Sequence, residues 1–136
     1  MDEIVINEYT ECLVNKIPGI DEIWLFGSQV NPSDKDPSDW DLFVFANNEV
    51  LDLLKKDISL KRNKFDLLIV INGDDFMEPW PEKQDLPKQG KLSDWEWKKI
   101  SRTQAAYIGT KEPVDGTEWR RSIVSKQKAI RLWPNC

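Results

Sequence analysis

The spacing of apolar positions changes several times along the chain, and each change predicts a different element. Four apolar side chains in residues 2–17 recur every three or four positions, namely Ile6, Tyr9, Leu13 and Ile17. That spacing is the period of a helix with one buried face. Pro18 and Gly19 follow at once and end the predicted helix.

Three runs rich in β-branched and aromatic residues predict three strands, over residues 20–26, 39–46 and 65–71. The middle run is continuously apolar from its fourth residue, which is typical of a strand buried on both faces. Between the second and third strands we expect a helix that ends near Ile58, with Asn47 or Asn48 as its cap. Its inward-facing side chains would be Val50, Leu51 and Leu54.

The connections between these elements carry turn residues. Residues 29–38 contain Asn-Pro-Ser-Asp and Asp-Pro-Ser, which predict a loop, and a short helix is expected directly after Gly27-Ser28. A basic connection over residues 61–64 leads into the third strand, and Asn72-Gly73-Asp74 predicts a turn after it.

The C-terminal half has weaker patterns. Residues 76–91 hold three prolines and predict an irregular loop, and the alternation in residues 95–98 predicts a short edge strand. Ser101 to Gln104 has the form of a capping box, so we expect a helix over 102–108 that Gly109 closes. A last helix would begin after Thr117 and end before Pro134, with a strand over 128–133 as the alternative.

This order of elements predicts the α/β (α+β) class, with a small mixed sheet flanked by helices. A length of 136 residues is typical of one domain, over residues 1–136. The loop after the third strand is the best candidate for an internal boundary. Residues 76–136 would then form a C-terminal extension of unclear role.

Composition favours a soluble globular protein, because 40% of the residues are hydrophobic and 32% are charged. No apolar run approaches the roughly 20 residues that span a bilayer, and the acidic N-terminal residues do not form a signal peptide. The two cysteines, Cys12 and Cys136, do not make a disulfide framework. We therefore expect a cytoplasmic protein with no membrane partner.

The chain contains no histidine. This excludes Ser-His-Asp and Cys-His catalysis and HExxH zinc sites. The Walker A sequence, the GxGxxG fingerprint and the CxxC pair are missing as well. Any acid–base chemistry must therefore use carboxylates, lysine, tyrosine, cysteine or metal-bound water.

Charge is distributed unevenly, although the net value is only −5. From Lys98 onward the chain carries nine basic and three acidic side chains, so the acidic excess lies before it. Such contrast favours a polyanionic or acidic partner for the basic part. The alternative is that this basic tail is solvated or complements the acidic half of its own chain.

The best candidate site joins Gly27-Ser28 to three acids. Ten residues separate this pair from Asp39, and Asp39 and Asp41 stand at positions i and i+2 of a predicted strand, so both side chains point the same way. Asp66, near the start of the third strand, adds a further carboxylate. Mg²⁺ takes one or two carboxylates together with phosphate oxygens, and glycine lets the backbone approach a phosphate closely.

Simpler roles exist for each residue. Gly-Ser is a common turn, Asp39 could cap the loop, Asp41 could face solvent, and Asp66 could pair with Lys64. Asp74 and Asp75 compete with Asp66 for the part of third acid, although they lie in the turn after the strand.

Residues 4–71 resemble the nucleotidyltransferase domain of the DNA polymerase β superfamily. The parts of its signature occur in order as Phe26-Gly27-Ser28, Asp39-Trp40-Asp41-Leu42 and Asp66. The resemblance implies transfer of a nucleoside monophosphate from an NTP, with ATP as the expected donor, to an acceptor hydroxyl. It implies that Gly27 and Ser28 hold the terminal phosphates. The three aspartates would be the catalytic residues and would bind Mg²⁺ or Mn²⁺, and Asp66 would draw the proton from the acceptor.

The resemblance leaves the acceptor open between a protein, an RNA and a small molecule. Small members include antitoxins that adenylylate a partner toxin, and a chain of this size favours a partner protein, whereas the basic tail favours RNA. Trp95 or Trp97, beside Lys98 and Lys99, would be the pair to stack on a base. Residues 29–32 lack the arginine and glycine that many members carry there. A weakly active or inactive module that binds a partner protein or nucleic acid is therefore the alternative function.

Overall fold

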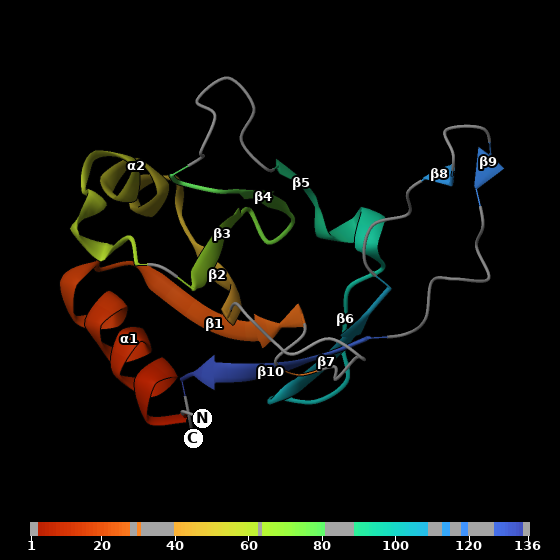
Figure 1. Ribbon diagram of the computed structural model, residues 1–136, viewed down its shortest axis with the longest axis horizontal. Coiled ribbons are helices and arrows are strands. Elements are labelled where there is room, and N and C mark those ends of the chain that lie inside the picture. Colours follow the sequence, from red (N-terminus) through yellow and green to blue (C-terminus); the bar gives the residue numbers. More distant parts are fainter. Residues whose placement is uncertain are drawn as a thin grey trace.

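One mixed β-sheet of eight strands organises the part of the chain that the computed structural model describes, which is residues 3–27, 30, 40–62, 64–80, 89–108, 113–114, 118–119 and 127–134 (Figure 1). The described elements, in chain order, are α1 (Glu3–Lys16), β1 (Ile20–Phe26), β2 (Trp40–Ala46), α2 (Asn48–Lys56), the 3-10 helix η2 (Ile58–Leu60), β3 (Phe65–Ile71), β4 (Asp75–Met77), β5 (Gln89–Lys91), the 3-10 helix η3 (Leu92–Trp95), β6 (Lys98–Lys99), β7 (Gln104–Tyr107), β8 (Pro113–Val114), β9 (Glu118–Trp119) and β10 (Gln127–Trp133).

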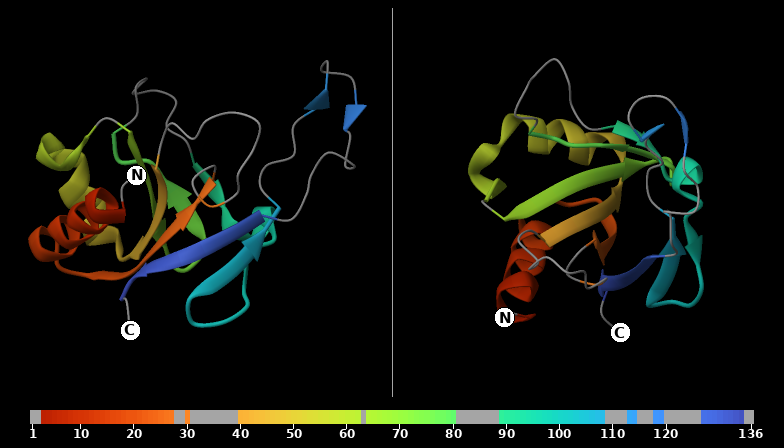
Figure 2. Two further views of the ribbon diagram at one scale, coloured as in Figure 1. Left: turned by 60° about the horizontal axis from the view of Figure 1, so that its bottom comes forward. Right: turned by 45° about the vertical axis from the view of Figure 1, so that its right-hand side comes forward.

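The strand order of the sheet is β5-β4-β3-β2-β1-β10-β7-β6, and β8 and β9 form a separate pair. β2 and β3 run parallel, whereas the other neighbouring strands of the large sheet run antiparallel. A parallel pair needs a long crossover connection, and α2 with η2 provides it. The sheet curls, and the two α-helices lie on one side of its central strands while η3 lies on the other (Figure 2).

The helix side of the sheet has an aliphatic core. The apolar face predicted for α1 is buried, and so are the three inward-facing side chains of α2, Val50, Leu51 and Leu54. They pack on the alternate residues of the central strands, among them Leu42, Val44, Leu67 and Ile69. Period-two alternation gives the strands this aliphatic face and leaves their other residues for the opposite side.

Hydrogen bonds to the backbone hold the helix layer in place. Asn47 caps α2, because its Oδ1 accepts from the Val50 amide at 3.1 Å. The Tyr9 hydroxyl on α1 donates to the Leu60 carbonyl at 2.7 Å, and Trp80 Nε1 donates to the Leu54 carbonyl at 2.6 Å. The bonds from Tyr9 and Trp80 link segments that are distant in the sequence to the crossover connection.

The opposite side of the sheet has an aromatic core. Phe26 on β1 stacks on Phe43 of β2, with ring centroids 4.0 Å apart and an interplanar angle of 11°. Trp95 from η3 meets Phe43 edge-on at 5.4 Å and Phe76 at 5.2 Å. Such offset and edge-to-face pairs add to the free energy gained by burying the rings. We call this group the aromatic cluster; its buried members are Trp24, Phe26, Phe43, Leu68, Val70, Phe76, Leu92, Ala105, Tyr107 and Ala129.

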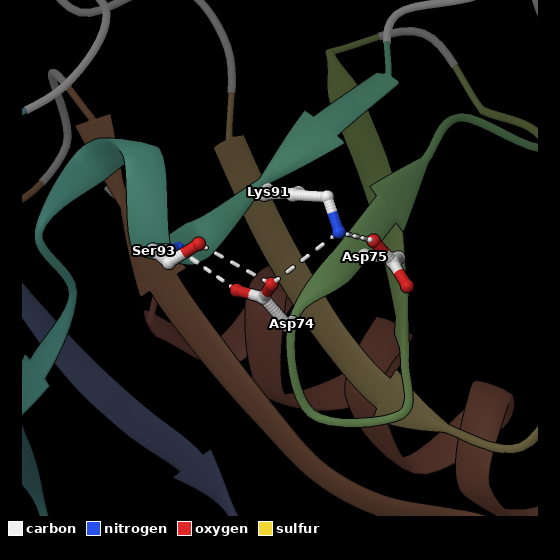
Figure 3. Close-up of polar contacts among 4 residues, drawn as sticks. All are labelled: Asp74, Asp75, Lys91 and Ser93. Carbon is white, nitrogen blue, oxygen red and sulfur yellow. Dashed lines mark hydrogen bonds and ion pairs between the residues drawn. The ribbon is translucent and has the colours of Figure 1, made fainter.

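A polar clamp fastens the end of β3 to η3 (Figure 3). The predicted turn is confirmed, since Asn72 and Gly73 have φ angles of 56° and 72°. Asp74 then accepts hydrogen bonds from the Ser93 amide at 2.8 Å and from its hydroxyl at 3.3 Å. Lys91 Nζ lies 3.0 Å from Asp75 Oδ1. The clamp holds β5 and η3 against the turn, and with them the Trp95 ring.

The predictions for the N-terminal half are largely confirmed. The first and third predicted strands coincide with β1 and β3, and α1 falls within the predicted helix. α2 begins after the expected cap and ends two residues before Ile58, where η2 starts. β2 begins at Trp40, because Asp39 lies outside the described residues.

The predictions for the C-terminal half are wrong in most places. The helix expected over 102–108 is strand β7, since Ala105 and Tyr107 are buried in alternation with more exposed neighbours, and β10 pairs with this segment. The end of the segment predicted as the last helix is strand β10, so the alternative of a strand is confirmed for that part. The sheet therefore has eight strands and is not small.

Two further predictions fail in the segment between β3 and β7. The loop expected over 76–91 contains most of β4 and all of β5, which extend the sheet beyond β3. The edge strand expected over 95–98 is confined to β6, because η3 ends at Trp95 and Glu96 has a left-handed φ of 54°. Within the described residues, every helix is too short or too polar to cross a membrane.

Leu54→Ala tests the helix-side core against a neighbour in the same helix. Leu54 is fully buried and Leu53 is 45% exposed. Leu54→Ala should lower the free energy of unfolding by about 2–5 kcal/mol, because it leaves a cavity. Leu53→Ala should lower it by less than about 1 kcal/mol. Urea unfolding followed by circular dichroism measures both, and equal losses would contradict this packing.

Candidate functional site

The end of β1 lies against the start of β2. Phe26 pairs with Asp41 in the antiparallel ladder, and Gly27 follows with a φ of +80°. A Cβ atom added at Gly27 would collide with Asp41 Oδ2. Glycine is required here for two reasons: the backbone is left-handed, and the Asp41 carboxylate occupies the space that a side chain would need.

Asp41 and Asp66 face each other across the parallel strands β2 and β3. They are direct partners in the register of this pair, and each is the second residue of its strand. Neighbouring strands lie about 4.8 Å apart, so the two carboxylates share one short stretch of the sheet. Asp41 is half-buried and Asp66 is exposed.

Both aspartates lie on the aromatic side of the sheet. Phe43 follows Asp41 by two positions and Leu68 follows Asp66 by two, and both belong to the aromatic cluster. Period-two alternation gives residues at i and i+2 the same face. The carboxylates therefore lie at one end of this face, away from the α-helices.

A backbone hydrogen bond fixes where β2 and β3 begin relative to each other. The Trp40 amide donates to the Lys64 carbonyl at 2.6 Å, and Trp40 pairs with Phe65 as the first step of the parallel ladder. Lys64 has a φ of 75°, which turns the chain into β3. The next step of the ladder is the aspartate pair.

Tyr107 on β7 is part of this site, although the sequence pattern does not predict it. Its hydroxyl oxygen accepts a hydrogen bond from the Gly27 amide at 3.0 Å, across 80 positions of the sequence. Burial raises the pKa of Tyr107, the hydrogen bond from Gly27 lowers it in part, and the charge of Asp41 raises it further. The phenol therefore keeps its proton at neutral pH. A local pattern could not have found it, since the contact exists only once β7 and β1 share a sheet.

The rest of the predicted site lies outside the described residues. That applies to Ser28 and Asp39, while Gly27 begins a turn in which its carbonyl accepts from the Val30 amide at 3.1 Å. Within the described ranges no three acidic or cysteine side chains gather as a metal-binding group. The predicted group includes Asp39, so those ranges contain only its other two members. Their carboxylate oxygens are the hard donors that Mg²⁺ takes.

Asp74 and Asp75, the competing acids, lie beyond the other end of β3, Asp74 in the turn and Asp75 at the start of β4. They follow the far end of β3, whereas Asp66 lies at its start. Both belong to the polar clamp with Lys91 and Ser93 (Figure 3). Of the three acids considered for the third position, Asp66 is the one in register with Asp41.

Trp95 and Trp97 are partly buried against the aromatic cluster. Trp97 meets Trp24 edge-on at 5.4 Å. The rings of Trp95 and Trp97 lie nearly parallel to the Tyr107 ring, with centroids at 5.8 and 6.1 Å. Packing is thus the role that the structure gives them. Stacking on a base stays a prediction.

Lys99, in the basic tail that begins at Lys98, pairs with the acidic half of the chain. Lys99 Nζ lies 2.9 Å from Glu22 Oε2 and 5.7 Å from the centroid of the Trp24 ring. Glu22 also accepts from Trp24 Nε1 at 2.7 Å. This contact favours, for Lys99, the alternative in which the basic tail complements its own chain.

Comparison with known proteins identifies the family of the chain. The family model described as "Polymerase beta, Nucleotidyltransferase" matches residues 7–79. The match is more than half of the chain, and it includes Gly27, Asp41 and Asp66 but not Tyr107. Curated proteins and solved structures gave no match. The chain belongs to the polymerase beta nucleotidyltransferase family.

Proposed function

We propose that this protein transfers a nucleoside monophosphate from an NTP to an acceptor hydroxyl and releases pyrophosphate. The observation that carries the proposal is the register of β2 and β3, which pairs Asp41 with Asp66 beside Gly27. Two carboxylates next to a glycine turn suit a substrate whose reacting group is a metal-bound triphosphate. ATP is the expected donor.

Asp41 and Asp66, with Asp39, would hold Mg²⁺ or Mn²⁺. Bound ions of this kind neutralise charge on the phosphates and on the attacking and leaving oxygens. The half-buried Asp41 lies against the Gly27 backbone, which limits the positions its carboxylate can take. A carboxylate fixed in this way holds a ligand with little loss of entropy on binding.

The other residues would position the substrate. Gly27 lets the backbone come close to the terminal phosphates, and Ser28 adds a hydroxyl donor. Asp66 is exposed and can be reached by an acceptor from solvent. In the transfer step the acceptor oxygen bonds to the α-phosphorus and the bond from that phosphorus to the β-bridging oxygen breaks. Asp66 takes the hydroxyl proton, and pyrophosphate leaves.

Labelled nucleotides test the proposal and identify the acceptor. The purified protein is incubated with each α-³²P-labelled NTP, Mg²⁺ and separate protein, RNA and small-molecule fractions of a cell lysate. We expect metal-dependent label in one fraction, together with release of pyrophosphate. MgATP binding without any transfer would instead favour the alternative, an inactive module that binds a partner protein or nucleic acid.

Neutralising either aspartate should abolish the transfer. Asp41→Asn and Asp66→Asn each remove a charged donor, so the rate should fall on the order of 100-fold or more while the melting temperature is kept. Asp75→Asn is the matched control, because Asp75 is an acid of the same sheet whose partner is Lys91. Asp75→Asn should transfer at the wild-type rate. Full activity in both Asp41→Asn and Asp66→Asn would contradict these roles.

Gly27→Ala and Gly73→Ala separate backbone strain from displacement of Asp41. Both glycines have left-handed φ angles, of +80° and +72°, so each alanine should cost about 1–2 kcal/mol of stability. A Cβ at Gly73 meets nothing within 4 Å, whereas one at Gly27 collides with the Asp41 carboxylate. Only Gly27→Ala should lose MgATP binding in calorimetry, and equal binding by the two variants would count against the role of Gly27.

A further inference from the structure

The hydroxyl of Tyr107 joins strand β7 to the backbone of Gly27, because its oxygen accepts a hydrogen bond from the Gly27 amide at 3.0 Å. The Gly27 amide follows the last residue of β1, and the last register pair of β1 with β10 is Leu25 with Ile130. The ladder with β10 therefore ends before Gly27. Tyr107 supplies the acceptor at the position where the ladder stops.

The Tyr107 ring is held tightly, so its oxygen has a defined place. The residue is 4% exposed, and its ring meets Phe26 edge-on at 5.9 Å. Trp95 and Trp97 lie nearly parallel to it, at interplanar angles of 27° and 26°. A rigid neighbour of this kind fixes the group to which it is bonded better than a solvent-exposed side chain does.

Gly27 is constrained from two sides as a result. The Asp41 carboxylate occupies the space where a Cβ would lie, and the Tyr107 oxygen holds the amide. These two contacts limit the positions that the Gly27 backbone can take.

We propose that Tyr107 is a positioning residue for nucleotide binding, which sets the Gly27 backbone so that the following turn can hold the phosphates. The proposal rests on the function proposed above. It extends the site beyond the family match, which ends at residue 79, into strand β7. The C-terminal strands would then contribute to binding as well as to the core.

Tyr107→Phe tests this in the full chain, with Tyr9→Phe as the matched control. These are the two tyrosines of the chain, both are buried, and both hydroxyls bond to backbone. Phenylalanine keeps either ring and removes one oxygen. Tyr107→Phe should raise the Kd for MgATP about tenfold or more, and the Gly27 amide should exchange its hydrogen faster. Tyr9→Phe should change neither the Kd nor the exchange of the Gly27 amide, although both variants should lower the melting temperature by similar amounts.

The outcomes separate the two proposals. If the wild-type protein binds MgATP and Tyr107→Phe binds it with the same Kd, the positioning role is overturned and the transferase function stands. Equal weakening by both tyrosine variants would also overturn it, because a general loss of stability would then explain the effect. A wild-type protein that neither binds MgATP nor transfers a nucleotide would overturn the proposed function, and the positioning role with it.

Discussion

The parallel pairing of β2 with β3 is the constraint on which the rest of the structure depends. It requires a crossover, and α2 with η2 provides one that buries the aliphatic side of the sheet. It also decides which residues face one another at the start of the two strands. A shift of one residue would move every side chain of a strand to the other face. The pairing of Asp41 with Asp66 is therefore fixed by the same contacts that form the core.

The second half of the chain completes the sheet around this pair. β10 pairs with the edge of β1 that β2 leaves open, and β7 follows it, so C-terminal strands support the site on the side of β1. The polar clamp of Asp74, Asp75, Lys91 and Ser93 fixes η3, and η3 places Trp95 in the aromatic cluster (Figure 3). The cluster in turn holds Tyr107 against Gly27.

The sequence predicted what depends on local pattern. β1 and β3 are long apolar runs, α1 and α2 have clear apolar faces, and Asp66 was preferred to Asp74 because of its place at a strand start. β5 and β7 are not predicted and β6 is misplaced, because these strands have only two to four residues, too few to show a period. The capping-box form of residues 101–104 is a local signal, and pairing of β7 with the distant β10 overrides it. Tyr107 was missed for the same reason.

The position of a bound Mn²⁺ ion tests the central claim most directly. Mn²⁺ broadens the signals of nearby amides in the ¹H–¹⁵N spectrum of a labelled protein. With ATP present, we expect broadening that centres on the amides of Gly27, Asp41 and Asp66. Broadening that centres on Asp74 and Asp75 instead, or no broadening at the highest concentration of ATP tested, would contradict a nucleotide site at the start of β2 and β3.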